Sequence, residues 1–157
     1  WGDILLTANN EGLTGLSFLS STSSTLLDDR CTDKDKNKIN ESALLTETCL
    51  QLDQYFLGQR RTFSIPLFPQ GTVFQKKVWR TLTAINYGKT VSYLWIAQKI
   101  KNEKAVRAIG AANAANPIPL IIPCHRVIGK NGKLTGYSGG IALKAKLLMH
   151  EGAHFNK

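Results

Sequence analysis

Cys124 and His125 are neighbours in the stretch IIPCHRVIG, residues 121–129, which follows a proline-rich apolar run. A thiol beside an imidazole can act as an activated nucleophile, because the histidine can remove the thiol proton. In extended backbone, however, neighbouring side chains point to opposite faces. We expect the backbone here to be extended. Proton transfer then requires either a turn that brings the two side chains together or a bridging water molecule.

Glu151 is one of only two carboxylates in residues 69–157, and it follows His150 near the C-terminal end. A carboxylate can orient an imidazole that acts as a base, so Cys124, His125 and Glu151 form a candidate nucleophile, base and orienting group. Prolines around Cys124 preclude a helix, and the cationic surroundings favour a lowered thiol pKa. A buried, inert thiol is the alternative.

The other two cysteines carry no comparable signal. Cys49 shares helical spacing with Leu45, Leu52 and Phe56, which favours a place in the core. Cys31 lies in a polar segment and has no metal-ligand spacing to a histidine. Three widely spaced cysteines fit a reducing cytoplasm better than a disulfide framework, so we expect a cytoplasmic protein.

Charge is distributed unevenly along the 157 residues. Residues 1–68 contain six basic and nine acidic residues, a net charge of −3, whereas residues 69–157 contain fourteen basic and two acidic residues, a net charge of +12. This asymmetry favours a polyanionic partner for the second half, DNA or RNA rather than a membrane. A solvated basic surface is the alternative. There is no long apolar stretch, and the start lacks a signal-peptide pattern.

Residues 1–68 are predicted to form a small α/β domain in the order strand, strand, helix, strand. Strands at 3–7 and 13–19 flank a turn, a helix follows in ALLTETCLQLDQYFLG, and residues 62–66 form the last strand. The polar segment at about residues 20–42 is predicted to be a mobile loop.

Residues 69–157 are predicted to form a second, mainly helical domain. Thr72 can cap a helix that runs to about Ile85, and Ser92 can cap a short one. A turn at Lys101 and Asn102 then leads to a second helix, which makes a helix-turn-helix candidate. A hairpin that turns at residues 131–132 would serve as a wing, and a basic amphipathic helix closes the domain.

The second helix of this candidate pair is rich in small residues and carries a single arginine, Arg107. Small side chains let a helix backbone approach another surface closely. The other surface is either the protein core or a DNA groove, and even the narrow minor groove would suit this helix. In the second case Arg107 would be the one long side chain that reaches in.

Four motifs together resemble the O6-alkylguanine-DNA alkyltransferases (methylated-DNA–protein-cysteine methyltransferases) in their bacterial constitutive form. They are FPQGTVFQKKVW, GKTVSY, VRAIGAANAANPIPLIIPCHRVIG and TGYSGG with KLLMHEG. The resemblance is strong over residues 70–152, and in the first half it is limited to the order of elements. It implies an α+β fold, with a small ribonuclease-H-like α/β N-terminal domain at 1–68 and a C-terminal winged helix-turn-helix domain at 69–157.

The resemblance also implies direct-reversal DNA repair. Members of this family bind double-stranded alkylated DNA through the minor groove and flip the damaged base out of the stack. They then transfer an alkyl group from O6-alkylguanine irreversibly to the cysteine of PCHR, here Cys124, so each molecule acts once. O4-methylthymine is an expected second substrate. We expect no cofactor, metal or membrane, and a monomer that could bind cooperatively on DNA.

Residue roles follow from the matching positions. His125 would act as the base through a bridging water and Glu151 would orient it, while Tyr93 would donate a proton to the guanine ring so that a neutral base leaves. Asn116 would hold the turn beneath Cys124. The remaining matches are the DNA contacts Arg107, Ala108, Ala111 and Asn113, with Arg107 replacing the flipped base, and the guanine-pocket residues Pro119, Val127, Tyr137, Ser138 and Gly139.

One local departure and two rival functions remain. Asn113 and Ala114 stand where some relatives have a large apolar residue and an arginine, which affects the pocket wall and the phosphate contacts. A cysteine hydrolase could use the same Cys-His-Glu set, but it would turn over and would need an oxyanion hole. A winged helix that only recognises alkylated DNA is the other rival, and the presence of Cys124 argues against it.

Overall fold

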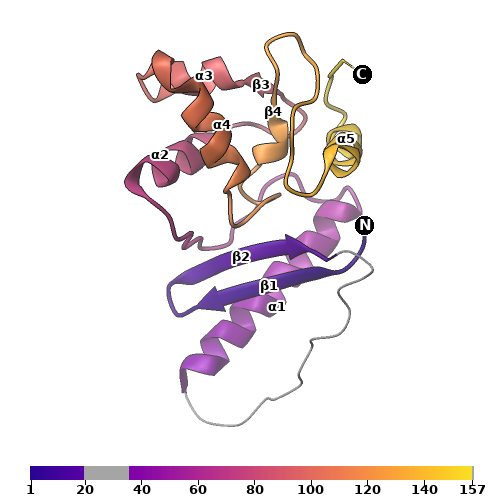
Figure 1. Ribbon diagram of the computed structural model, residues 1–157. Coiled ribbons are helices and arrows are strands. Elements are labelled where there is room, and N and C mark those ends of the chain that lie inside the picture. The colour runs from indigo at the N-terminus through magenta and orange to yellow at the C-terminus, as the bar shows by residue number, and fades with distance from the viewer. Residues whose placement is uncertain (20–35, 157) are drawn as a thin grey trace. The chain divides into compact units, whose positions relative to one another are not determined.

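The computed structural model describes residues 1–19 and 36–156, and the chain divides into two compact units, Trp1–Pro69 and Gln70–Lys157 (Figure 1). Helices and small sheets occur together, as an α+β fold requires. Among the described residues, no helix combines the length and the apolar character needed to cross a bilayer.

The N-terminal unit contains an antiparallel hairpin of β1 (Ile4–Asn9) and β2 (Gly12–Phe18), followed by helix α1 (Lys36–Phe56). The Asn9 side chain closes the hairpin turn, since its Oδ1 accepts hydrogen bonds from the backbone amides of Glu11 and Gly12. The hairpin and the helix were predicted. The loop prediction was wrong for residues 36–42, which are helical, and residues 20–35, including Cys31, lie outside the described part.

The predicted strand at residues 62–66 is absent. A single bridge joins Leu13 to Leu67, and the amide of Ser64 donates instead to Oε1 of Gln51 at 2.9 Å. The Gln51 side chain therefore accepts the hydrogen bond of a backbone amide that would otherwise pair with a neighbouring strand. The sequence alone does not distinguish these arrangements, because residues of high β-propensity suit both a paired strand and an extended segment bonded to a helix side chain.

Helix α1 buries a face that overlaps only in part with the one predicted. Thr48, Gln51, Leu52 and Tyr55 are buried, whereas Cys49 is exposed, so the prediction of a core cysteine was wrong. The reason is that two polar residues occupy the buried stripe. Thr48 donates to a carbonyl one turn earlier, and the Gln51 side chain is fully hydrogen-bonded, which removes the cost of burying them.

The C-terminal unit begins with three helices, α2 (Val73–Leu82), α3 (Tyr93–Lys99) and α4 (Val106–Ala114). Thr72 and Gln75 form a capping box for α2, and the hydroxyl of Ser92 accepts from the Trp95 amide at the start of α3. Lys101, with φ of 57°, turns the chain between α3 and α4. Both predicted caps and the helix-turn-helix order are confirmed.

A parallel pairing in this unit connects distant segments. Strand β3 (Val91–Ser92) pairs with β4 (Val127–Ile128), which follows a 3-10 turn at Cys124–Arg126. Tyr93 comes directly after β3 and Cys124–Arg126 directly before β4. The pairing therefore brings the start of α3 beside the segment that carries the cysteine.

The predicted wing forms its turn but not its strands. Gly132 has φ of 77° and donates to Gly129, and the Gly129 amide donates to the Lys133 carbonyl, yet no strand occurs within residues 129–140. The chain instead continues as an irregular arm to α5 (Ile141–His150). This closing helix was predicted.

Candidate active site around Cys124

Cys124 lies at the end of a loop that the buried Asn116 side chain holds by two hydrogen bonds. The Oδ1 of Asn116 accepts from the Ile118 amide at 3.0 Å, and its Nδ2 donates to the Ile122 carbonyl at 2.8 Å. The amide of Cys124 also donates to the Ile122 carbonyl, at 2.8 Å. Leu120 adopts a left-handed conformation with φ of 75°, so the loop holds an unfavourable backbone state in place. Only 2% of Cys124 is exposed.

The backbone at Cys124 and His125 is a 3-10 turn, so the prediction of an extended segment was wrong. The two side chains need not point to opposite faces. Nδ1 of His125 is buried and has no hydrogen-bond partner among the described residues. This nitrogen is therefore available to take a proton, directly or through water, while the other ring nitrogen is already bonded.

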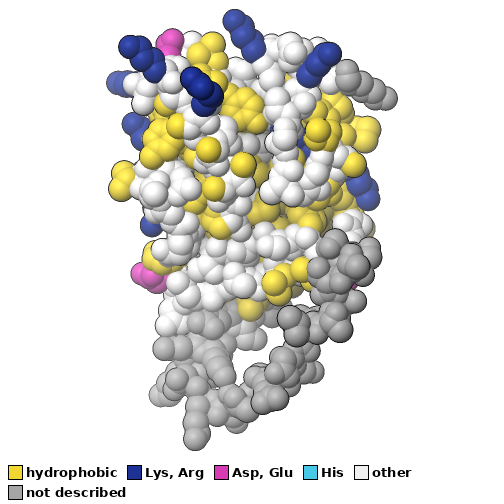
Figure 2. Space-filling view, in the orientation of Figure 1, with side chains coloured by type: hydrophobic (Ala, Val, Ile, Leu, Met, Phe, Trp, Pro, Cys, Tyr) yellow, Lys and Arg dark blue, Asp and Glu magenta, His cyan; other side chains and the backbone are white. Residues whose placement is uncertain are grey.

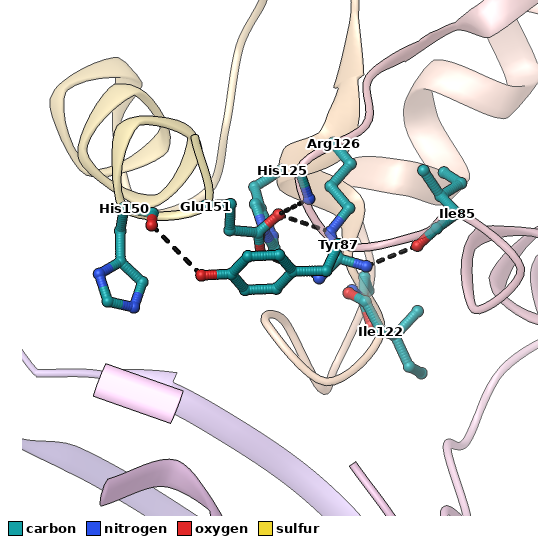
Figure 3. A network of polar contacts seen from close by, with 9 residues as sticks. Ile85, Tyr87, Ile122, His125, Arg126, His150 and Glu151 are labelled. Carbon is teal, nitrogen blue, oxygen red and sulfur yellow. Dashed lines mark hydrogen bonds and ion pairs between the residues drawn. The ribbon is translucent and has the colours of Figure 1, made fainter. Parts of the chain in front are cut away.

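Glu151 is hydrogen-bonded to three residues, of which His125 and Arg126 are drawn in Figure 3. Its Oε1 lies 2.9 Å from Nε2 of His125 and 2.9 Å from Nη2 of Arg126, and its Oε2 lies 2.9 Å from Nε of Arg126. The amide of Gly88 donates to Oε2 at 3.2 Å. With the carboxylate on Nε2, the histidine is oriented so that Nδ1 is its free basic atom.

The pKa values of this group follow from burial and pairing. Burial would raise the pKa of Glu151, but hydrogen bonds from His125 and Arg126 outweigh it and hold that pKa well below its usual range. Burial lowers the pKa of His125 despite the neighbouring Glu151, so the imidazole is neutral near pH 7. A neutral imidazole can accept a proton, which a base must do.

Burial raises the pKa of the Cys124 thiol, and the Asn116 side chain and the Lys144 charge offset this only partly. The prediction that cationic surroundings would lower this pKa was wrong, because the loss of hydration outweighs them. Cys124 is therefore a thiol near pH 7, and it would need a base beside it to act as a nucleophile.

Tyr137 also faces this centre. Burial, and then the Cys124 thiol nearby, raise the pKa of its hydroxyl. In the described part of the chain, the buried side-chain nitrogen and oxygen atoms without a partner are the Tyr137 hydroxyl, Nδ1 of His125 and Oδ1 of Asn113. Nδ2 of Asn113 bonds to the Cys124 carbonyl at 3.4 Å. The unpaired groups thus gather around the thiol, as expected where a polar ligand or water binds.

The Tyr93 hydroxyl lies 2.8 Å from Oγ1 of Thr135, which belongs to the arm after β4. The backbone of that arm is held by the fully buried Lys144, whose ammonium donates to the Thr135 carbonyl at 3.2 Å and to the Val127 carbonyl at 2.6 Å. Burial lowers the pKa of Lys144 to about 8, although Cys124 nearby opposes this shift.

The predicted pocket residues have different degrees of burial. Pro119 and Val127 are buried in the loop and in β4, whereas Ser138 and Gly139 are exposed on the arm. A side chain at Gly139 would meet Leu143 at 2.7 Å and the Tyr137 ring at 3.1 Å. Glycine here lets the arm pass close to α5.

The four predicted DNA contacts separate into two groups on α4. Arg107, Ala108 and Ala111 are exposed, which excludes the core-packing alternative for these small residues. Asn113 is buried and its amide points at the Cys124 loop instead. On the face shown in Figure 2, Lys and Arg side chains lie along the edges of the C-terminal unit.

Sequence reasoning did not assign roles to Arg126, Gly88, Thr135 or Lys144. Gly88 has φ of 72°, and a side chain there would meet the Glu151 carbonyl oxygen at 2.8 Å, so only glycine fits. Lys144 lies at helical spacing from the buried Leu147 and Leu148. The position of a lysine on the apolar face of a predicted helix was the one sequence signal that could have indicated a buried role for Lys144.

Comparison with known proteins agrees with this geometry. Residues 73–153 match the family described as 6-O-methylguanine DNA methyltransferase, DNA binding domain, and residues 1–69 match its ribonuclease-like domain. The methylated-DNA–protein-cysteine methyltransferase of Methanosarcina acetivorans is 43% identical over 152 residues, 97% of this chain and 93% of that protein. The constitutive methylated-DNA–protein-cysteine methyltransferase of Bacillus subtilis is 52% identical over 109 residues, 69% of this chain and 66% of that protein.

Among solved structures, that of Mycobacterium tuberculosis OGT in complex with DNA superposes with a TM-score of 0.79. It is 40% identical in sequence, and the match covers 95% of this chain and 86% of that one. The chain belongs to the 6-O-methylguanine DNA methyltransferase family.

Proposed function

We propose that the protein repairs alkylated DNA by direct reversal, moving an alkyl group from O6-alkylguanine, or from O4-methylthymine, to Cys124. The observation that carries this proposal is the pinned Cys124 turn, in which His125 has one nitrogen bonded to Glu151 and the other unpaired. This is a nucleophile with a base beside it, in a chain of the methyltransferase family.

The transfer is a displacement at the alkyl carbon. His125 takes the thiol proton, the sulfur forms a bond to that carbon, and the carbon–oxygen bond breaks. The released electron pair stays on guanine, which takes a proton from the Tyr93 hydroxyl and leaves as a neutral base. Tyr93 regains a proton from solvent, and His125 releases to solvent the proton that it took from the thiol. In sum the alkyl group replaces the thiol proton, and the thioether that results is stable, so the protein acts once.

DNA binding is assigned to α4 and the basic surface around it. Ala108 and Ala111 are small and exposed, so the α4 backbone can approach a groove closely, and Arg107 is the long side chain on that face. We place Arg107 in the space that the flipped base vacates, where it offsets the unstacking cost. The M. tuberculosis relative was solved in complex with DNA, which supports DNA as the binding partner. Action on chromosomal DNA would place the protein in a prokaryotic cytoplasm.

Two other functions fit the site less well. A hydrolase would need a set of donors aimed at an oxyanion, but the amide of Cys124 is already bonded to the Ile122 carbonyl. A non-enzymatic binder would need no base paired with its cysteine, whereas His125 and Glu151 are buried for this purpose at a cost in solvation.

Mass spectrometry after incubation with duplex DNA that contains one O6-methylguanine tests the proposal. The expected result is one added CH2 unit per protein, confined to the peptide that holds Cys124, with guanine restored in the DNA. A hydrolase would release product repeatedly without a stable mass change. A pure binder would show neither result, and either outcome would refute alkyl transfer.

A further inference from the structure

The Tyr93 hydroxyl and the Thr135 hydroxyl form a hydrogen bond of 2.8 Å between segments 42 residues apart. We propose that Thr135 is a positioning residue for the transfer reaction, which holds the Tyr93 hydroxyl so that its proton points at the flipped base. This inference rests on the proposed function. It goes beyond that function because it assigns the control of the proton donor to a residue outside the motif that carries the nucleophile.

The direction of this hydrogen bond matters for proton donation. A threonine hydroxyl can both donate and accept, and so can a phenol. When Thr135 donates to the Tyr93 oxygen, the phenolic proton is left free for the guanine ring. The same bond then stabilises the negative charge that develops on the Tyr93 oxygen as its proton leaves. A methyl group at this place could do neither.

Both partners are held in place by contacts independent of each other. Tyr93 is the first residue of α3, directly after the Ser92 cap and the β3–β4 pairing. Thr135 lies in an arm without strands, but its carbonyl accepts from Lys144, which also binds the Val127 carbonyl of β4. Lys144 therefore ties the arm to the strand that follows the Cys124 turn, and Thr135 is placed relative to the nucleophile.

The arrangement predicts a defect of a particular kind when the hydroxyl is removed. Thiol activation by His125 does not pass through Thr135, and neither does DNA binding by the exposed face of α4. Only the transfer of a proton from Tyr93 to the leaving base depends on Thr135. Loss of the hydroxyl should slow only reactions in which the leaving group needs a proton from Tyr93.

The test compares Thr135→Val, which keeps the shape and removes the hydroxyl, with Thr135→Ser, which keeps the hydroxyl. Single-turnover transfer from O6-methylguanine DNA should slow about 10-fold or more in Thr135→Val and by no more than about 2-fold in Thr135→Ser. Affinity for the same duplex should be unchanged. Thermal melting of each variant establishes that it folds.

Two further reactions distinguish positioning from a structural role. With 3-deaza-O6-methylguanine, which has C–H in place of the minor-groove ring nitrogen, Thr135→Val and the native protein should react at equal rates. Iodoacetamide, whose iodide leaves without a proton, should alkylate Cys124 equally fast in both. A Tyr93→Phe background should abolish the effect of Thr135→Val, because the two residues then act as one unit.

The outcomes are separable. If Thr135→Val transfers methyl as fast as the native protein, or if it is slowed equally with all three reagents, the inference is overturned while the proposed function stands. If Thr135→Val does not fold, the comparison of Thr135→Ser with Thr135→Ala decides in the same way. If the native protein itself transfers no methyl group, the proposed function fails and this inference fails with it.

Discussion

Arg126 and Glu151 form a two-point ion pair in which Nε and Nη2 of the guanidinium each lie 2.9 Å from a carboxylate oxygen. Both side chains are buried, and the remaining Arg126 nitrogen, Nη1, donates to the Ile85 carbonyl (Figure 3). The pair neutralises the charge of Glu151 while leaving Oε1 able to accept from His125. The carboxylate that bonds to His125 is therefore itself fixed by Arg126, the next residue in the chain.

Glu151→Gln should destabilise the protein in a pH-dependent way. At pH 7 the variant leaves Arg126 without its anionic partner, which costs about 3–5 kcal/mol in the free energy of unfolding. The folded-state pKa of Glu151 lies below its ordinary value of 4.5, so this contribution is complete above about pH 4.5 and is lost as the pH falls towards the lower folded value. Urea unfolding at pH 7 and at lower pH checks this.

The control for that measurement is Glu103→Gln, which removes an exposed carboxylate of the same domain. It should change stability by less than about 0.5 kcal/mol at any pH. A gap between Glu151→Gln and native protein that widened on acidification would contradict the assigned pairing.

Cys124→Ala should abolish methyl transfer and leave DNA affinity nearly unchanged, because the thiol is buried and the exposed face of α4 is untouched. Loss of label transfer from methylated DNA, with retained binding in a mobility-shift assay, checks this. Cys49→Ala is the matched control, since Cys49 is an exposed thiol of the other unit. Label that still accumulates on Cys124→Ala would exclude this residue as acceptor.

The rate of methyl transfer should be nearly constant between pH 8 and pH 6.5 and should fall only at lower pH. Burial lowers the pKa of His125 below its ordinary value of 6.5, so the imidazole stays neutral and basic through this range. The Cys124 pKa lies above 9.0, so the thiol does not ionise by itself there. Single-turnover rates across this range test both statements.

A rate that fell already between pH 8 and pH 7 would show that His125 has a raised pKa. His125→Gln should react much more slowly than the native protein and should lose the decrease in rate at acid pH. It therefore distinguishes titration of His125 from acid unfolding.

Local signals predicted much of the fold and led to the candidate reacting residues. The caps at Thr72 and Ser92 depend on side chains a few residues from the backbone they bind, so sequence is enough to find them. The adjacency of Cys124 and His125 and the rarity of acidic residues in the second half led to Glu151. His125 and Glu151 do meet in the structure, and Cys124 precedes His125 in the same 3-10 turn.

Features that depend on distant partners could not be predicted in this way. The buried face of α1 includes Gln51 because Ser64, thirteen residues away, satisfies its amide, and this is why Cys49 is exposed. The raised Cys124 pKa reflects burial, which charge counting does not include. The sequence does not indicate a role for the Thr135 hydroxyl, because its hydrogen-bond partner, Tyr93, lies 42 residues away in the chain.

Ala111→Leu should weaken binding to duplex DNA by about 10-fold or more, equivalent to about 1.4 kcal/mol. Ala111 lies on the exposed, small-residue face of α4 beside Ala108, and a leucine there would hold the helix backbone away from a groove. Because Ala111 is exposed, reaction with free O6-methylguanine base should keep its native rate. Fluorescence anisotropy and single-turnover labelling measure the two quantities.

The matched control is Ala142→Leu, the same change at an exposed position of α5. It should leave DNA affinity within about 2-fold, since added apolar surface on its own has little effect on a mainly electrostatic interaction. If Ala111→Leu bound DNA as tightly as the native protein, α4 could not be the element that enters the groove. If it also slowed reaction with the free base, the substitution would have disturbed the Cys124 pocket rather than the DNA contact.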